Sequence, residues 1–212
     1  MVKIPDSSIL PPLENGDRLN RYEFERRYAQ NPLKKAELIE GVVYMPAALR
    51  FRSHSQPHGN LFGWLWTYAI STSNVELGIE PIVRLDIDNA PQPDAVLFIT
   101  GGQACISEDD YIEGAPELVA EIAASSVAID LNAKKQAYRR NGVKEYIVWQ
   151  VYDQKIDWFY LQEGEYIPLS LDENNIIRSH TFPGLWLVPE DLLAGNMTQV
   201  LAVLQKGLKS RS

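Results

Sequence analysis

Cysteine, basic residues and long hydrophobic segments are all scarce in this sequence of 212 residues. Cys105 is the single cysteine, so no disulfide can form within the chain and a reducing compartment is expected. No apolar run approaches the 18 residues or more that a membrane-spanning helix needs, and residues 1–16 contain no apolar segment typical of a secretion signal. These absences predict a cytoplasmic protein with no membrane partner.

The shortage of basic residues limits the kinds of nucleic-acid binding that are expected. The chain has 20 Lys and Arg against 28 Asp and Glu, a net charge of −8. Proteins that bind nucleic acid strongly and without sequence preference usually carry a basic surface. The composition argues against that class of protein. It is still compatible with a small basic cleft in an otherwise acidic protein.

The order of the predicted elements favours an α/β fold with a mixed central β-sheet flanked by helices. Helices are expected at residues 20–30, 57–71, 126–142 and 189–207, a hairpin at 36–46, and further strands at 94–99, 117–123, 144–152, 155–162 and 165–171. We predict an irregular lead-in at 1–19, a main domain at 20–190, and a C-terminal helix and tail at 191–212.

Two acids stand in apolar runs that are typical of central strands covered on both faces. Asp94 opens the run at 94–99, and Glu121 lies near the end of the run at 117–123. If the strands are neighbours, the carboxylates converge and raise each other's pKa unless a cation lies between them. Mg²⁺ fits such a position and can activate water and polarise a phosphate. The alternative is that both are ordinary surface or capping acids.

The predicted helix after Glu121 presents three polar residues at spacings of four. Asp130, Lys134 and Tyr138 therefore share one helical face. A lysine directed at the two acids could hold the attacking water or neutralise charge that builds on a phosphate. The alternative is an exposed pair between Asp130 and Lys134, which would contribute only about 0.3–0.5 kcal/mol.

An ordered set of short motifs extends this pattern over the chain. It comprises "ELIEG" at 37–41, His58 before a helix, "PD" at 93–94, "PELVAEI" at 116–122, Asp130, Lys134, Tyr138, "GVKEYIVW" at 142–149 and "FPGLWL" at 182–187. Over roughly residues 20–190 the set resembles the Uma-type "putative restriction endonuclease" family, which is similar to the PD-(D/E)XK nuclease superfamily. The resemblance implies a restriction-endonuclease-like fold with a four-stranded mixed sheet, and a Mg²⁺ or Mn²⁺ site that cuts phosphodiester bonds.

The resemblance also implies roles for individual residues. Asp94 and Glu121 would be metal ligands, and Glu37 would be a further acid at the metal, although it could be confused with Glu40. The superfamily lysine normally lies two residues after the second acid, where this chain has Ala123. Lys134 from the following helix would take its place as a catalytic residue.

His58 matches the family histidine and would orient water or contact a phosphate, or else simply cap or fill the fold. His54 is four residues earlier, but Pro57 disfavours a regular helix between the two, so we do not expect them to act as a metal pair. The chain departs from the family at residues 124–126, Ala-Ser-Ser, and at Gln150. Neither departure removes a predicted metal ligand.

Two functions are compatible with these observations. The first is a Mg²⁺-dependent endonuclease acting on nucleic acid, with DNA favoured, and working as a homodimer. The second is a catalytically degenerate nuclease fold that serves as a dimeric binding module, burying aromatic residues such as Trp149, Trp158, Phe159 and Trp186 in its interface. Tryptophan residues are equally expected in the core. The buried acid at Glu121 favours the enzyme, because it would cost several kcal/mol without a cation.

Overall fold

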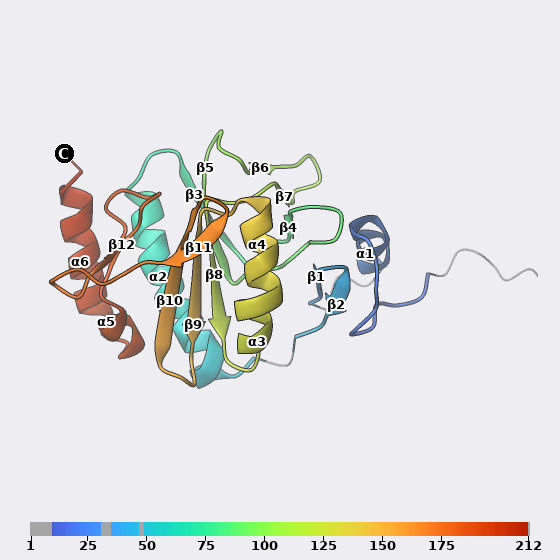
Figure 1. Ribbon diagram of the computed structural model, residues 1–212, viewed down its shortest axis with the longest axis horizontal. Coiled ribbons are helices and arrows are strands. Elements are labelled where there is room, and N and C mark those ends of the chain that lie inside the picture. The colour runs from blue at the N-terminus through green and yellow to red at the C-terminus, as the bar shows by residue number, and fades with distance from the viewer. Residues whose placement is uncertain (1–9, 31–34, 47–48, 212) are drawn as a thin grey trace, which may run out of the picture.

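A mixed six-stranded sheet forms the centre of the protein, seen here in a computed structural model that describes residues 10–30, 35–46 and 49–211 (Figure 1). Its strands in spatial order are β11 (Glu165–Pro168), β10 (Lys155–Gln162), β9 (Glu145–Gln150), β8 (Leu118–Ala123), β5 (Ala95–Ile99) and β3 (Val75–Ile79). β8 and β9 run parallel, and the other neighbours are antiparallel. The predicted fold class is confirmed. The sheet has six strands rather than the four implied by the resemblance, because β3 and β11 extend its edges.

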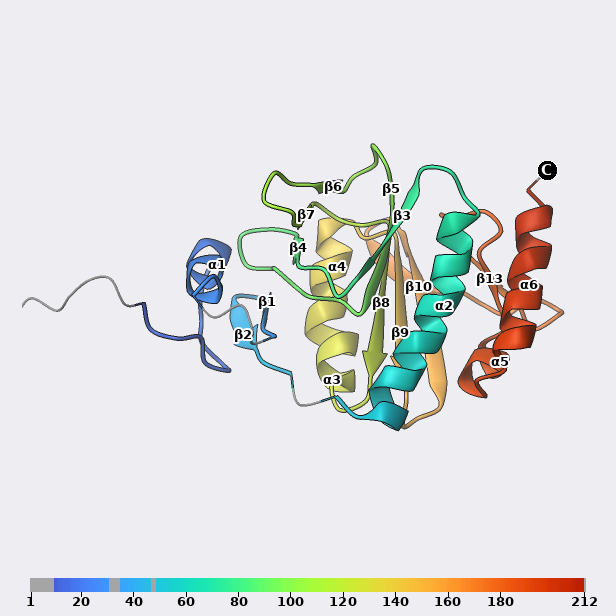
Figure 2. The same cartoon turned by 180° about the vertical axis from the view of Figure 1, so that it is seen from behind.

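Helices cover both faces of this sheet. Figure 2 shows α2 (Gln56–Ile70) crossing one face, with α5 (Pro189–Leu193) and α6 (Met197–Lys209) beyond it, whereas Figure 1 shows α4 (Lys135–Asn141) in front of the other. Along β8, Ile122 packs in the core on the α2 side, and its neighbour Ala123 packs in the core on the α4 side. Since side chains alternate along a strand, Glu121 faces α4.

The C-terminal segment contains two helices instead of the single helix predicted at 189–207. α5 ends at Leu193, and α6 begins at Met197. Gly195, between them, has a φ of +74°, a left-handed conformation that breaks the helical path. Within the described ranges, no helix combines the length and the apolar character needed to cross a membrane.

The N-terminal elements follow the sequence pattern closely. α1 (Arg21–Tyr28) begins after Asn20, whose side-chain oxygen accepts a hydrogen bond from the Glu23 amide at 3.0 Å, as the predicted N-cap requires. β1 (Glu37–Ile39) and β2 (Val42–Tyr44) form the predicted hairpin. Of the predicted lead-in at 1–19, residues 1–9 lie outside the described residues. Arg18 forms an isolated antiparallel β-bridge with Val42 of β2.

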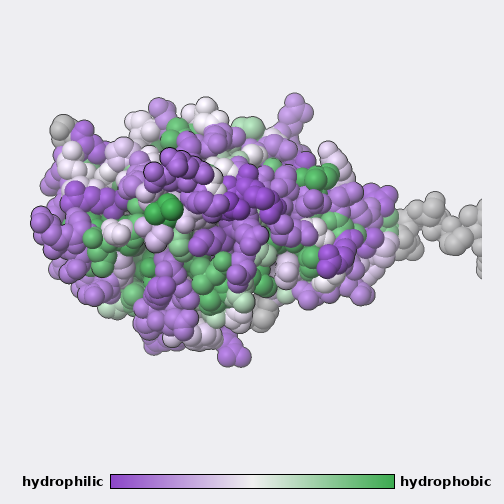
Figure 3. All heavy atoms as spheres, in the orientation of Figure 1, coloured by the Kyte–Doolittle hydropathy of each residue, from purple (hydrophilic) through white to green (hydrophobic). Residues whose placement is uncertain are grey.

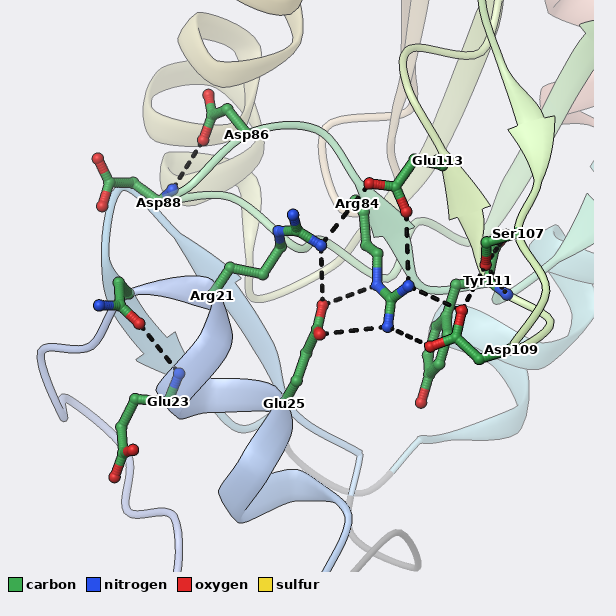
Figure 4. A network of polar contacts seen from close by, with 11 residues as sticks. Arg21, Glu23, Glu25, Arg84, Asp86, Asp88, Ser107, Asp109, Tyr111 and Glu113 are labelled. Atoms are coloured by element: carbon green, nitrogen blue, oxygen red, sulfur yellow. Dashed lines mark hydrogen bonds and ion pairs between the residues drawn. The ribbon is translucent and has the colours of Figure 1, made fainter.

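A network of ion pairs joins α1 to a small sheet of β4 (Val83–Arg84), β7 (Ile112–Glu113) and β6 (Cys105–Ile106). Its centre is the Arg84 guanidinium, shown in Figure 4. Arg84 Nε lies 2.7 Å from Glu25 Oε1, Nη2 lies 2.7 Å from Asp109 Oδ2, and Nη1 lies 3.4 Å from Glu113 Oε2. We call Arg84 and these three acids the arginine network. It ties the N-terminal elements to the body of the molecule.

The aromatic residues expected at a dimer surface lie mainly inside the chain. Trp149, Trp158 and Phe159 are buried in the core, and Trp186 is half-buried beneath the Arg178 guanidinium. The prediction that these residues form an interface is therefore wrong for the three buried side chains, because α2, α4 and the neighbouring strands already cover them. On the face shown in Figure 3, hydrophilic side chains predominate and the apolar areas between them are small.

Candidate active site

Lys134 is the centre of a buried group of charged side chains. Its Nζ lies 2.9 Å from Glu37 Oε2, 3.1 Å from Glu121 Oε1 and 3.6 Å from Asp130 Oδ1. We call these four residues the lysine cluster. They come from β1, β8 and the segment after β8, so the fold brings together three of the predicted site residues from distant parts of the sequence.

A π-helical turn places Lys134 in this cluster. The segment predicted as one helix at 126–142 consists of α3 (Val127–Ile129), a π-helical turn η2 (Asp130–Lys134) and α4, which ends at Gly142 with a φ of +84°. Such turns interrupt the regular helical hydrogen bonding and are frequent at functional sites. Here the turn begins and ends on two members of the cluster.

Two hydroxyl groups hold the acids in position. The Tyr138 hydroxyl donates a hydrogen bond to Glu121 Oε1 at 2.8 Å, and the Ser126 hydroxyl donates to Asp130 Oδ2 at 2.6 Å. Ser126 belongs to the segment where the sequence departs from the family pattern, and it still supports a buried acid. Both bonds to the Glu121 carboxylate reach Oε1, so Oε2 is left to other ligands.

The lysine cluster holds more negative charge than its own cation neutralises. Burial raises the pKa of Glu121 well above its usual range, Lys134 opposes that shift, and the charges of Asp130, Asp94 and Glu37 add to it. Burial also raises the pKa of Asp130. Desolvation alone would lower the pKa of Lys134, but the surrounding carboxylates raise it well above its usual range. One ammonium among three carboxylates leaves an excess of negative charge, which attracts cations.

Asp94 lies beside this cluster, at the start of β5. Its Oδ2 accepts a hydrogen bond of 2.6 Å from the Ile122 amide, immediately after Glu121 on the neighbouring strand. Its Oδ1 lies 3.3 Å from His54 Nε2, a contact with the distance of an ion pair but without hydrogen-bond geometry. Burial would raise the pKa of Asp94, but His54 and the Ile122 amide lower it below its usual value. Asp94 is therefore held as a carboxylate.

The helix between the two histidines is irregular, as Pro57 predicts, but the two rings lie close together. His54 lies in a π-helical turn, η1 (Phe51–Ser55), which continues directly into α2. Pro57 is in the first turn of α2, directly after this π-helical turn. The rings of His54 and His58 are 5.5 Å apart, and both contact Asp94.

A second group of ligand-type side chains therefore surrounds Asp94. One ligand atom from each member lies within 4.8 Å of the others, and we call this group the histidine cluster: His54, His58, Glu80 and Asp94. It contains Asp94 and His58 from the predicted site, but neither Glu37 nor Glu121. The prediction that Asp94, Glu121 and Glu37 share one metal stays a prediction, as do the roles of Lys134 and His58.

Sequence reasoning missed Glu80 and discounted His54. The spacing of His54 and His58, four residues apart at the start of a helix, was the available signal for the histidines. Glu80 has no local signal, because it approaches Asp94 only through the pairing of Ile79 in β3 with Ala95 in β5. Glu40, the residue that could be confused with Glu37, pairs instead with Arg140 at 2.6 Å on an exposed part of the chain.

The donor atoms at this end of the sheet are of the chemical kind that binds a divalent cation. Glu37, Glu121 and Asp94 offer carboxylate oxygens, which are the ligands that Mg²⁺ and Mn²⁺ prefer. Asp94, just before β5, and Glu121, in β8, lie at neighbouring positions on adjacent strands, and both are buried. A cation here would balance the negative charge that Lys134 leaves uncompensated.

Comparisons with known proteins concern the fold and the family. A crystal structure of a protein from Anabaena variabilis ATCC 29413, described as a "putative nuclease belonging to DUF820", superposes with a TM-score of 0.62 at 17% identity, covering 80% of this chain and 96% of that one. At this identity the likeness concerns the fold. No curated protein matches the sequence. The model of the Uma2 family, described as "Putative restriction endonuclease", matches residues 21–192, and the chain belongs to this family.

Proposed function

We propose that the protein is a divalent-metal-dependent endonuclease that hydrolyses phosphodiester bonds, with Mg²⁺ or Mn²⁺ as the ion and DNA as the favoured substrate. The observation that carries the proposal is the lysine cluster, in which three buried carboxylates meet one ammonium beside the carboxylate of Asp94. Such a surplus of buried negative charge is costly in a protein that holds no cation. The family membership supports a nuclease, and DNA is the substrate class of restriction endonucleases.

In this proposal Asp94 and Glu121 hold the ion. Glu37 lies next to the ion and also contacts Lys134. A bound divalent ion would supply an activated water and neutralise charge on the phosphate. The hydrogen bond from Tyr138 fixes the direction of the Glu121 carboxylate, and the Ile122 amide does the same for Asp94. These contacts hold both ligands in place before a substrate arrives.

Lys134 acts as a cation in this scheme. Its pKa is raised by the carboxylates around it, so it keeps its proton at neutral pH and is no general base. A fixed ammonium next to the scissile phosphate stabilises the negative charge that develops there. His58 donates its Nε2 hydrogen to the Asp94 carbonyl at 2.9 Å, and a role for it in orienting water remains part of the proposal. The homodimer and the cytoplasmic location also stay predictions.

A nicking assay on supercoiled plasmid tests this proposal. We expect nicking with Mg²⁺ or Mn²⁺, none with EDTA, and a loss of at least about 100-fold in Glu121→Gln. Glu165→Gln is the matched control, because that side chain is exposed on β11 and pairs only with Arg139. A parallel assay with single-stranded and duplex RNA defines the substrate class.

Two results would contradict the proposal. One is equal nicking by the wild type and Glu121→Gln, which would point to a contaminating nuclease. The other is the absence of any cleavage of DNA or RNA by a folded protein with either ion. The second result would favour the alternative of a degenerate nuclease fold that binds its partner without cutting it.

A further inference from the structure

We propose that the histidine cluster binds a first-row transition-metal dication, at a site separate from the lysine cluster. The inference goes beyond the proposed nuclease activity, since it needs neither Glu121 nor Lys134. It starts from the finding that two imidazoles and two carboxylates, from three separate segments of the chain, each bring a ligand atom within 4.8 Å of the others.

Asp94 organises this group through its backbone as well as its side chain. Its carbonyl oxygen accepts a hydrogen bond from the Glu80 amide at 3.2 Å and another from His58 Nε2 at 2.9 Å. Because a carbonyl oxygen only accepts, Nε2 of His58 carries the proton, and a neutral ring keeps its lone pair on Nδ1. The Asp94 carboxylate faces His54.

The backbone conformation of Glu80 fixes where its side chain begins. Glu80 has a φ of +48°, in the left-handed region that a residue with a β-carbon rarely adopts. The conformation occurs where β3 ends, one residue after Ile79, which pairs with Ala95. Six other non-glycine residues of the described chain also have a positive φ, so this conformation sets the direction of the chain after β3 without marking a site by itself. Here it sets Glu80 opposite Asp94.

The distances are close to those of an occupied site. Two ligands at about 2.1 Å from one ion can be at most ~4.2 Å apart, so atoms spread over 4.8 Å need to close by well under an ångström. His54 Nε2 is buried and makes no hydrogen bond to the residues that the structure describes. A buried nitrogen without a hydrogen bond is the kind of atom that an ion would satisfy.

The donor atoms distinguish this site from the lysine cluster. Imidazole nitrogens suit zinc, iron, nickel and copper, whereas Mg²⁺ takes oxygen ligands in a strict octahedron and keeps several waters. The lysine cluster offers oxygen ligands alone. We therefore expect the histidine cluster to prefer ions such as Zn²⁺ or Co²⁺ over Mg²⁺, with Asp94 between the two sites.

A plain pair of salt bridges is the competing explanation. In it, His54 only neutralises Asp94, and Lys35, whose Nζ lies 3.0 Å from Glu80 Oε1, only neutralises Glu80. The Lys35 side chain is partly exposed, so it can turn to solvent when an ion takes its place beside Glu80. The two explanations differ in what a transition metal does to the histidine rings.

Nuclear magnetic resonance of the imidazole rings tests the proposal, because the chain has three histidines and His180 lies away from the cluster, against the Tyr160 ring. With Zn²⁺ we expect the ring signals of His54 and His58 to shift and those of His180 to stay. In Glu121→Gln, which lacks a ligand of the proposed Mg²⁺ site, the same concentration of Mg²⁺ should shift none of them. A shift of all three rings, or of none, would overturn the proposal.

Titration with Co²⁺, followed by its visible absorption, gives the second readout. We expect His54→Ala to weaken Co²⁺ binding by about 100-fold or more. His180→Ala and Glu121→Gln should bind as the wild type does, and the latter separates this proposal from the nuclease proposal. Glu80→Gln, with circular dichroism to confirm folding, serves if His54→Ala does not fold, and it should also weaken binding. Unchanged Co²⁺ affinity in folded His54→Ala or Glu80→Gln would overturn the site.

Discussion

The lysine cluster and the arginine network are each centred on one cation that faces three carboxylates, in different surroundings. Lys134 faces Glu37, Glu121 and Asp130, and Arg84 faces Glu25, Asp109 and Glu113. Arg21 adds a second cation to the arginine network, at 3.2 Å from Glu25 Oε1 and 3.8 Å from Glu113 Oε1, so the lysine cluster has the larger surplus of negative charge. The acids of the lysine cluster have side chains at most 12% exposed, whereas those of the arginine network are between 23% and 57% exposed.

The difference in exposure reverses the direction in which the pKa of an acid shifts. Hydrogen bonds from Arg84 and Ser107 lower the pKa of Asp109 to about 2, whereas burial raises the pKa of Glu121 well above its usual range. Water screens the surplus charge of the arginine network, so that network serves to join α1 to the small sheet. The lysine cluster lacks this screening, which is why we propose that a cation from outside the chain balances its surplus charge.

The largest effect should come from removing the cation of the lysine cluster. In Lys134→Met, three buried carboxylates lose the ammonium that they share, and we expect the free energy of unfolding to fall by about 3–5 kcal/mol. Urea denaturation at pH 7 without divalent ions measures this change. A loss below about 1 kcal/mol would mean that water reaches the cluster and that it resembles the arginine network.

Divalent ions should stabilise the protein through the lysine cluster. At 100 times its dissociation constant, Mg²⁺ should add about 2.7 kcal/mol, because it binds only the folded chain. For a chain of this size the gain corresponds to a rise in Tm of roughly 5–10 °C, measurable by calorimetry. Glu121→Gln should lose this response and Glu113→Gln, in the arginine network, should keep it. An equal response in both variants would place the ion elsewhere.

Removing the cation of the arginine network should cost less. Arg84→Met leaves three acids that can turn towards water, so we expect the free energy of unfolding to fall by about 1 kcal/mol. The same denaturation experiment as for Lys134→Met makes the two substitutions directly comparable. If Arg84→Met is as destabilising as Lys134→Met, burial is not what separates the two networks.

The smallest effect should be a loss of stability at low pH that depends on Asp109. Asp109 has a pKa of about 2 in the folded protein against an ordinary value of 3.8, so its charged form favours the folded state. The stability that the wild type gains over Asp109→Asn should be complete above pH 4 and should disappear as the pH falls to about 2. Denaturation of both proteins across this range measures it. A difference that stays constant with pH would show that Arg84 does not hold Asp109.

Sequence reasoning recovered the elements better than the details of the site. The strand at Glu121, the lysine on the next helix and the hairpin acid Glu37 follow from periodicity and from the ordered motifs, and these residues meet as expected. The break at Gly195 was not predicted, because the apolar spacing continues through it.

The histidine cluster shows why the rest could not be predicted. Pro57 disfavours a regular helix, and a π-helical turn does precede it, but the sequence did not indicate that this turn brings the His54 ring close to the His58 ring. Glu80 depends on the register of β3 against β5, which is a long-range property. The two π-helical turns that carry His54 and Lys134 also have no recognised pattern in the sequence.

The most direct test of the central claim is the anomalous scattering of crystals soaked in Mn²⁺. The account predicts a manganese peak in contact with the carboxylates of Asp94 and Glu121, and its loss in crystals of Glu121→Gln. The contrary result is a manganese peak only at exposed acids such as Asp109 and Glu113. Glu121 would then be neutralised by Lys134 without a metal ion, which would contradict the account.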